Sequence, residues 1–352
     1  MEGNRVETPV QWHSMEEPGF SLEGLNWHRP GGILRRIPDQ AFISPRVNAL
    51  ADNTAGVMLR FRSDTTRLLL DVKLKPWDET ESWIMAKSAT AGFDLYIGSG
   101  HSKVFAGSTR TQQGACDYKM EFCLGESSGA VREYTVNFPL YCGVDSLKIG
   151  LSEKASILPP TPWADSRPVV VYGTSIQQGG CVSRPGMCHT NQMSRLLDRP
   201  FLNMAFSGAG IGEPEMAELL AQIPNPAMFV LDYDANAAPA RLKATLPAFI
   251  DILRKKHPAV PILLVSRLPM AREFLTSSAC IQPRQDWTEI HLNELARRRK
   301  AGDGNIHFLD GSTLFGPDPS ECTVDGVHAT DLGMYFIAHT MAPVIERILT
   351  WK

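Results

Sequence analysis

Hydrophobic and polar residues alternate along the first half of the chain. Between residues 66 and 75, leucine or valine occupies every second position, and residues 57–61 and 133–138 follow the same rule. A period of two is typical of strands that bury one face. Many such short segments, separated by turns rich in Gly, Ser and Asn, predict an antiparallel β-sandwich of jelly-roll type.

The pattern changes after a proline-rich segment. Continuous apolar runs now alternate with helical segments, as a parallel sheet covered on both faces requires. These runs lie at 169–172, 201–206, 227–231, 260–265 and 306–309. Apolar residues at helical spacing between 332 and 348 predict a closing helix that packs on the sheet. We therefore expect a β-sandwich domain at 1–158, a semi-rigid linker at 159–168 and an α/β domain at 169–352.

Chemically active residues follow these runs. Ser175 comes after the strand-like run at 169–172 and a glycine, and near the C-terminus Asp325 precedes His328 by three residues. A serine hydroxyl is a weak nucleophile at neutral pH, so it needs an imidazole base, which a carboxylate orients. The sequence therefore predicts an activated-serine hydrolase, with Ser175 as nucleophile, His328 as base and Asp325 as orienter.

Two further runs end in small or polar residues, at Gly208 and Asn236. With Ser175 and His328 they form four blocks in the chain order Ser, Gly, Asn, His, and over residues 169–345 the chain resembles the SGNH (GDSL-type) hydrolase superfamily. The resemblance implies a flavodoxin-like three-layer α/β/α domain and a serine esterase. It also implies an oxyanion hole made by the backbone N–H groups of Ser175 and Gly208 and the side-chain amide of Asn236. In an open α/β sheet these positions converge at the carboxyl ends of the strands.

A second motif extends the resemblance to the first half of the chain. Residues 92–96 read Gly-Phe-Asp-Leu-Tyr, which is similar to the GxDLY motif in the N-terminal β-domain of a bacterial SGNH subfamily. Three positions depart from the superfamily pattern. Thr174 stands where an Asp is usual, Asn236 lies in Asp-Tyr-Asp-Ala-Asn, and Ala329 replaces a Pro after the histidine.

Each candidate also has a structural alternative. His189 lies close to the nucleophile in sequence and is a rival base. Asp325 is also a turn residue before a glycine, Gly208 could simply end a strand, and Asn236 could cap a helix. Asp232 and Asp234 receive no assigned role.

Substrate contacts are the least specified part of the site. Gln177, Arg184 and His189 lie on the polar loop after the nucleophile, and Arg267 follows another strand end. We expect them to line the mouth, with loop scaffolding as the alternative. Because no broad aliphatic lid segment is present, a small acyl group, such as acetyl, on a polar or carbohydrate-like alcohol is the expected substrate.

Two tryptophans of the β-domain, Trp77 and Trp83, flank an acidic turn, and we expect each to pack in the core, with a glycan-stacking platform as the alternative. Three functions are therefore compared. The first is a serine esterase working through an acyl-enzyme, the second an acyltransferase using the same intermediate, and the third a catalytically inactive carbohydrate-binding protein.

Composition narrows the remaining choices. The 352 residues carry a net charge of −3 without a basic run, which argues against nucleic acid and membrane partners and favours a small-molecule or glycan ester. We expect no cofactor and no metal, since no His/Cys cluster has ligand spacing. The first 30 residues lack the pattern of a secretory signal, so a cytoplasmic location and free thiols at the seven cysteines are expected. A homo-oligomer is compatible with the sequence.

Overall fold

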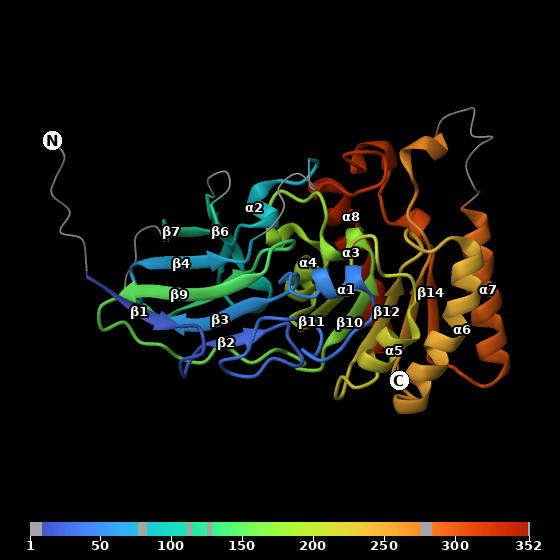
Figure 1. Cartoon of the computed structure of the whole chain (residues 1–352), viewed down its shortest axis with the longest axis horizontal. Coiled ribbons are helices and arrows are strands. Elements are labelled where there is room, and N and C mark those ends of the chain that lie inside the picture. The colour runs from blue at the N-terminus through green and yellow to red at the C-terminus, as the bar shows by residue number, and fades with distance from the viewer. Residues whose placement is uncertain (1–8, 77–82, 111–114, 125–128, 275–283, 351–352) are drawn as a thin grey trace.

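The computed structural model describes residues 9–76, 83–110, 115–124, 129–274 and 284–350. The chain is elongated, with antiparallel sheets at one end and a helix-covered parallel sheet at the other (Figure 1). Trp77 and Cys280, which the sequence-based expectations include, lie outside the described residues.

Two antiparallel sheets form the first unit, in the strand orders β1-β9-β4-β7 and β2-β3-β8-β5-β6. The first sheet contains β1 (Val10–Ser14), β9 (Val144–Ser152), β4 (Leu68–Leu74) and β7 (Asp117–Phe122). The second contains β2 (Ser21–Glu23), β3 (Met58–Ser63), β8 (Arg132–Asn137), β5 (Asp94–Ile97) and β6 (Val104–Ser108). The short helix α2 (Lys87–Thr90) precedes β5.

The two sheets share one hydrophobic core. Leu59 and Phe61 of β3 are fully buried in it together with Leu68, Leu70 and Val72 of β4. These are the residues that the alternating pattern assigns to inward faces, because side chains two apart in a strand point the same way. The predicted strands around 57–61, 66–75 and 133–138 are thereby confirmed.

A five-stranded parallel sheet forms the second unit, in the order β11-β10-β12-β13-β14. Its strands are β10 (Val169–Gly173), β11 (Phe201–Ala205), β12 (Met228–Asp232), β13 (Ile262–Val265) and β14 (Ile306–Leu309). Its helices are α3 (Ser175–Gln178), α4 (His189–Leu197), α5 (Pro214–Leu220), α6 (Pro239–Lys256), α7 (Gln285–Lys300) and α8 (Asp331–Thr350). Every apolar run therefore forms a strand, and the strand order is that of a flavodoxin-like sheet.

The helices cover both faces of this sheet (Figure 1). Val170 and Tyr172 pack in the core with α5, α6 and α7, whereas Val169 and Val171 pack in the opposite core with α4 and α8. Both faces of β10 are thus buried, which is why its sequence is uniformly apolar. The expected three-layer α/β/α arrangement and the closing helix are confirmed.

A segment from the first half of the chain belongs to the second unit. Ile37 and helix α1 (Pro45–Leu50) pack in the α/β core. Beside them Arg36, only 1% exposed, donates hydrogen bonds to the carbonyls of Asn203 and Ala205 in β11. Burial lowers the pKa of Arg36 to about 9. The two units therefore interlock in a way that a boundary at residue 158 does not anticipate.

The described part of the chain shows the state of the cysteines and the exposure of Trp83. Its six described cysteines are free, as expected, and two of them, Cys116 and Cys123, flank the strand β7. Trp83 is 84% exposed, so core packing is wrong for this residue. Among the described helices, none has the length and apolar character needed to cross a membrane.

Candidate active site

Ser175, the candidate nucleophile, follows the carboxyl end of β10, which lies between β11 and β12 in the sheet. Thr174 caps the short helix α3, with its side chain and that of Gln177 forming a capping box. The Gln177 Oε1 accepts from both the N–H and the hydroxyl of Thr174, each at 2.8 Å. This reciprocal cap fixes the sharp strand-to-helix turn that presents Ser175. Threonine therefore serves as a helix cap at the position where the superfamily carries Asp.

Ser175, His328 and Asp325 form a continuous hydrogen-bonded chain. Ser175 Oγ lies 2.8 Å from His328 Nε2, and His328 Nδ1 lies 2.7 Å from Asp325 Oδ2. Ser175 is 9% exposed, whereas the histidine and aspartate side chains are 25% and 21% exposed. The arrangement lets the imidazole take the serine proton at Nε2 while the carboxylate holds Nδ1.

The backbone orients the carboxylate of this chain. Asp325 Oδ1 accepts hydrogen bonds from the N–H groups of Val327 at 2.9 Å and His328 at 2.7 Å. Partial burial acts to raise the Asp325 pKa, but these bonds and the His328 side chain together lower it. Asp325 is consequently both a turn residue and a partner of the imidazole, so the two readings of this residue are compatible.

Pairing in the flanking chain fixes the loop that carries the imidazole. Thr323 and Ala329 form an isolated β-bridge, and Val324 N–H donates to the His328 carbonyl at 2.9 Å. Ala329 is fully buried in the core that includes α8. An alanine at this position therefore leaves the histidine loop closed.

Gly208 lies in the turn after β11, close to the Asn236 side chain. It has φ +66°, and no atom lies within 4 Å of where its Cβ would be, so the turn has open space beside it. Within the described residues, its N–H has no hydrogen-bond acceptor. The Phe206 carbonyl accepts from Ala209 N–H at 3.1 Å and from Asn236 Nδ2 at 3.4 Å, which holds the two loops together.

Asn236 does not cap a helix. Helix α6 begins at Pro239 with Ala238 at its N-cap, and that cap makes no side-chain hydrogen bond. Asn236 instead lies in a half-buried turn that follows Asp232, the last residue of β12. One of its two amide hydrogens remains available for a ligand. The structure thereby removes the helix-cap alternative for this residue.

Two further side chains, Tyr141 and Gln178, contact the site, and the sequence indicates only Gln178, which lies on the polar loop after Ser175. Tyr141, which follows β8, donates from its hydroxyl to the Ser175 carbonyl at 3.0 Å. Gln178 bonds the Leu140 carbonyl through Nε2 and Ser207 N–H through Oε1. Because these contacts join segments far apart in the chain, only the tertiary fold brings the side chains to the site.

The GxDLY motif contacts the loop that follows the nucleophile. Asp94 is fully buried and accepts hydrogen bonds from Asn137, Arg184 and Gly186 N–H at 2.7–2.9 Å. Tyr96 of the same motif accepts from Arg184 at 2.7 Å. The motif therefore attaches the first unit to the loop between α3 and α4.

The four expected substrate contacts are placed differently from the prediction. Gln177, His189 and Arg267 are 2%, 1% and 3% exposed, so the folded chain covers them, and they do not line an open mouth. Arg267 forms an ion pair with Glu273. His189 lacks access to a substrate proton, which rules it out as the rival base. Arg184 is half-buried and lines a separate cavity instead.

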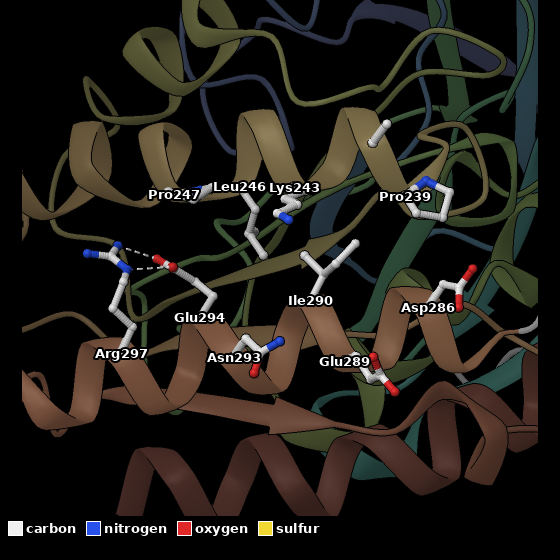
Figure 2. A pocket seen from close by; sticks show the side chains of 11 residues that line it. Pro239, Lys243, Leu246, Pro247, Asp286, Glu289, Ile290, Asn293, Glu294 and Arg297 are labelled. Carbon is white, nitrogen blue, oxygen red and sulfur yellow. Dashed lines mark hydrogen bonds and ion pairs between the residues drawn. The ribbon is translucent and has the colours of Figure 1, made fainter.

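Other groups near the site do not compete with the serine. Burial raises the pKa of the Cys181 thiol to about 12, with the Asp325 charge adding to the shift, so the thiol is protonated at neutral pH. The described residues contain no cluster of His, Cys, Asp or Glu suited to a metal. A groove of about 520 Å³ between α6 and α7, lined by Leu246 and Ile290 among others, contains neither the serine nor the imidazole (Figure 2).

The chain was compared with known families and structures. The model of the GDSL-like lipase/acylhydrolase family matches residues 166–346, and the model for the GxDLY N-terminal domain of SGNH-hydrolase-type esterases matches residues 10–157. Together the two matches cover nearly the whole chain. No curated protein matches it.

Solved structures with the same fold include three of interest. A GDSL-like lipase from Bacteroides ovatus is 28% identical, with a TM-score of 0.87 over 98% of this chain and 99% of that one. A salicylyl-acyltransferase from a tetracycline biosynthetic pathway is 19% identical, with a TM-score of 0.76 over 97% and 98%. An acetyl xylan esterase from the rumen bacterium Butyrivibrio proteoclasticus is 12% identical, with a TM-score of 0.61 over 97% and 100%.

Proposed function

The chain belongs to the GDSL-like lipase/acylhydrolase family and is an esterase of the SGNH type, and we propose that it removes small acyl groups, acetyl above all, from a polar or carbohydrate-like alcohol. The observation that carries the catalytic assignment is the 2.8 Å contact between Ser175 Oγ and His328 Nε2, with Asp325 behind the imidazole. No cofactor takes part in the proposed reaction.

In the acylation step, Ser175 Oγ attacks the ester carbonyl while its proton moves to His328 Nε2. The carbonyl oxygen becomes an oxyanion, which the N–H groups of Ser175 and Gly208 and the amide of Asn236 stabilise. One such donor lowers the activation free energy by about 3 to 4 kcal/mol. Collapse of the tetrahedral intermediate breaks the bond to the alcohol, which leaves with the proton from His328.

In the deacylation step, water takes the place of the alcohol. His328 accepts a proton from water as the hydroxyl oxygen bonds the acyl carbon. The second tetrahedral intermediate then releases Ser175, which recovers its proton, and the free acid leaves. Asp325 stabilises the transient imidazolium in both steps.

The surroundings of the nucleophile favour a small acyl group and a polar alcohol. Ser207, Asn236 and Tyr141 are half-buried polar side chains beside Ser175 and the Gly208 turn. Hydrogen-bonding groups of this kind orient a hydroxylated leaving group better than a long alkyl chain. The acetyl xylan esterase among the similar folds acts on such a substrate class.

Chain-length selectivity tests the acyl group. We expect kcat/KM to fall at least tenfold from p-nitrophenyl acetate to p-nitrophenyl octanoate, and acetate to be released from acetylated xylo-oligosaccharides. A kcat/KM that rises with chain length would overturn the small-acyl assignment while leaving the serine mechanism intact.

Acyl transfer is the alternative fate of the same acyl-serine. A pre-steady-state burst of p-nitrophenol should appear in both cases. Adding glycerol or glucose should leave the hydrolysis product dominant for an esterase, whereas an acylated acceptor as the main product identifies a transferase. Mass spectrometry of the products separates the two, and absence of both burst and turnover would contradict each.

A further inference from the structure

We propose that the junction of the two units holds a second binding site, separate from the catalytic serine, for a small organic anion such as a uronate or a phosphorylated sugar. A cavity of about 340 Å³ opens between the β5–β6 edge of the second sheet and helices α4 and α8. Its volume lies within the range of small-molecule sites. Ser175, Asp325 and His328 are absent from its lining.

The charge of the cavity wall indicates an anion. Lys103, Arg184 and Arg195 are the basic residues of the lining, His101 and His339 add two imidazoles, and none of the described lining residues is acidic. Arg184 is compensated by the buried Asp94 at 2.9 Å, whereas Lys103 and Arg195 make no ion pair within the described residues. An anionic ligand beside Lys103 and Arg195 therefore gains Coulomb energy from both.

The nearby carboxylates are already bonded, and one of them compensates a cation of the lining, since Asp94 pairs with Arg184. Asp94 lies behind the wall, is fully buried and is bonded by Arg184 and a backbone N–H. Glu23 and Glu133 both pair with Arg60. Asp198, at the end of α4, is the remaining acid near Lys103, and it accepts a hydrogen bond from a backbone N–H.

Arg195 and Lys103 differ in the hydrogen bonds and ring contacts that their charged groups make. The guanidinium of Arg195 donates hydrogen bonds to the backbone carbonyls of Asn191 and Gly186. These acceptors are neutral, so they do not compensate its charge. Lys103 is half-buried, its ammonium lies 4.6 Å from the centre of the Trp163 ring, and it makes no ion pair within the described residues. Burial, together with the nearby Arg60, lowers the pKa of Lys103 to about 8. Lys103 is therefore the group that gains most from an anion in the cavity.

Aromatic rings of the lining hold two of the cations in place. Arg195 lies 4.2 Å over Tyr96, and Arg184 lies 3.8 Å over Phe105, so the guanidinium groups are held rigidly against the wall. Tyr335 of α8 is 46% exposed at the rim. Fixed cations beside an apolar face recognise a carboxylate, sulfate or phosphate carried on a sugar or aromatic ring.

Calorimetric titration of the full chain with D-glucuronate, inorganic phosphate and neutral D-glucose tests the site. We expect saturable binding of at least one anion and none of glucose, with the stoichiometry unchanged in Ser175→Ala. Phosphate binding alone identifies a phosphate-recognising site, whereas glucuronate binding identifies recognition of a carboxylated ring. The proposal is overturned if neither anion binds. It is also overturned if glucose binds with the same affinity as glucuronate.

Matched variants locate the site. Lys103→Met should weaken the anion at least tenfold, whereas Lys73→Met, which removes an exposed lysine from β4, should not. If Lys103→Met does not fold, Tyr335→Glu adds a carboxylate at the rim and should weaken binding, while Leu332→Glu, equally exposed on α8 outside the lining, serves as its control. Equal losses in a variant and its control would overturn the assignment.

Discussion

Two histidine–aspartate pairs in the α/β unit look alike in their bonding and differ in their surroundings. His328 contacts Asp325 at 2.7 Å, with side chains 25% and 21% exposed, and its other nitrogen meets the Ser175 hydroxyl. His291 contacts both Asp234 oxygens at 2.9 Å, with side chains 1% and 0% exposed. A carboxylate beside an imidazole therefore does not by itself make a catalytic base.

The buried pair is part of the framework of the sheet. It connects α7, which carries His291, to the loop after β12, and Asp234 also accepts the Arg267 N–H at 3.0 Å. Buried polar groups that are hydrogen-bonded in this way stabilise one packing arrangement. Access to a nucleophile and to solvent distinguishes the proposed catalytic pair, and variants of the two pairs can test that distinction.

Removing the nucleophile should have the largest effect. Ser175→Ala eliminates the atom that forms the acyl-enzyme, so we expect kcat to fall by about 10⁴ to 10⁶ with unchanged thermal unfolding. Ser183→Ala is the control, because that hydroxyl bonds Asp331 and not His328. Burst kinetics with p-nitrophenyl acetate measure both variants. Activity of Ser175→Ala above a tenth of the wild type would contradict the assignment.

Matched substitutions in the two pairs should separate catalysis from stability. Asp325→Asn leaves the imidazole poorly oriented and its charge uncompensated, so kcat should fall by about 10⁴ while the melting temperature changes little. Asp234→Asn weakens a buried, charge-assisted hydrogen bond and should cost about 2 kcal/mol of unfolding free energy with kcat nearly unchanged. Both quantities should be measured on both variants. If Asp234→Asn lowers turnover as much as Asp325→Asn, the distinction between the pairs is wrong.

The oxyanion donor should have a smaller effect. Asn236→Ala removes an amide that contacts the substrate most strongly in the transition state, so kcat should drop by about 10² to 10³ with KM nearly constant. Steady-state kinetics and thermal unfolding of the same variant check this. Because Asn236 does not cap α6, a lower melting temperature with unchanged turnover would contradict its proposed role.

The sequence predicts what local patterns encode. The alternation of apolar and polar residues predicted β3 and β4, and the apolar runs predicted all five parallel strands. The offset of three residues between Asp325 and His328 predicted the contact between these two side chains. The pair between Asp234 and His291 has no such signal, because its members lie far apart in the chain and meet only when α7 packs on the sheet. Tyr141 was missed for the same reason.

The loop residues show the opposite error. Gln177 and His189 are polar and follow the nucleophile, so the sequence favours exposure at the mouth. Instead Gln177 completes the cap of Thr174 and donates to Asp232 at 2.7 Å, and both are buried. Gln177 can be buried because the fold supplies its hydrogen-bond partners, and one sequence does not reveal those partners in advance.

The last prediction concerns the buried His189 and the pH dependence of stability. Neither ring nitrogen of His189 has a hydrogen-bond partner within the described residues. Burial lowers its pKa from 6.5 to about 4. Because the unfolded chain binds a proton more readily than the folded one, His189 destabilises the fold as pH falls from about 6.5 towards 4. The loss should reach about 2 kcal/mol at pH 5. His189→Leu should remove this part of the pH dependence of urea unfolding between pH 7 and 5, whereas His101→Gln, at an exposed position, should leave it unchanged. A parallel pH dependence in wild type and His189→Leu would show that the folded protein accommodates the charged ring.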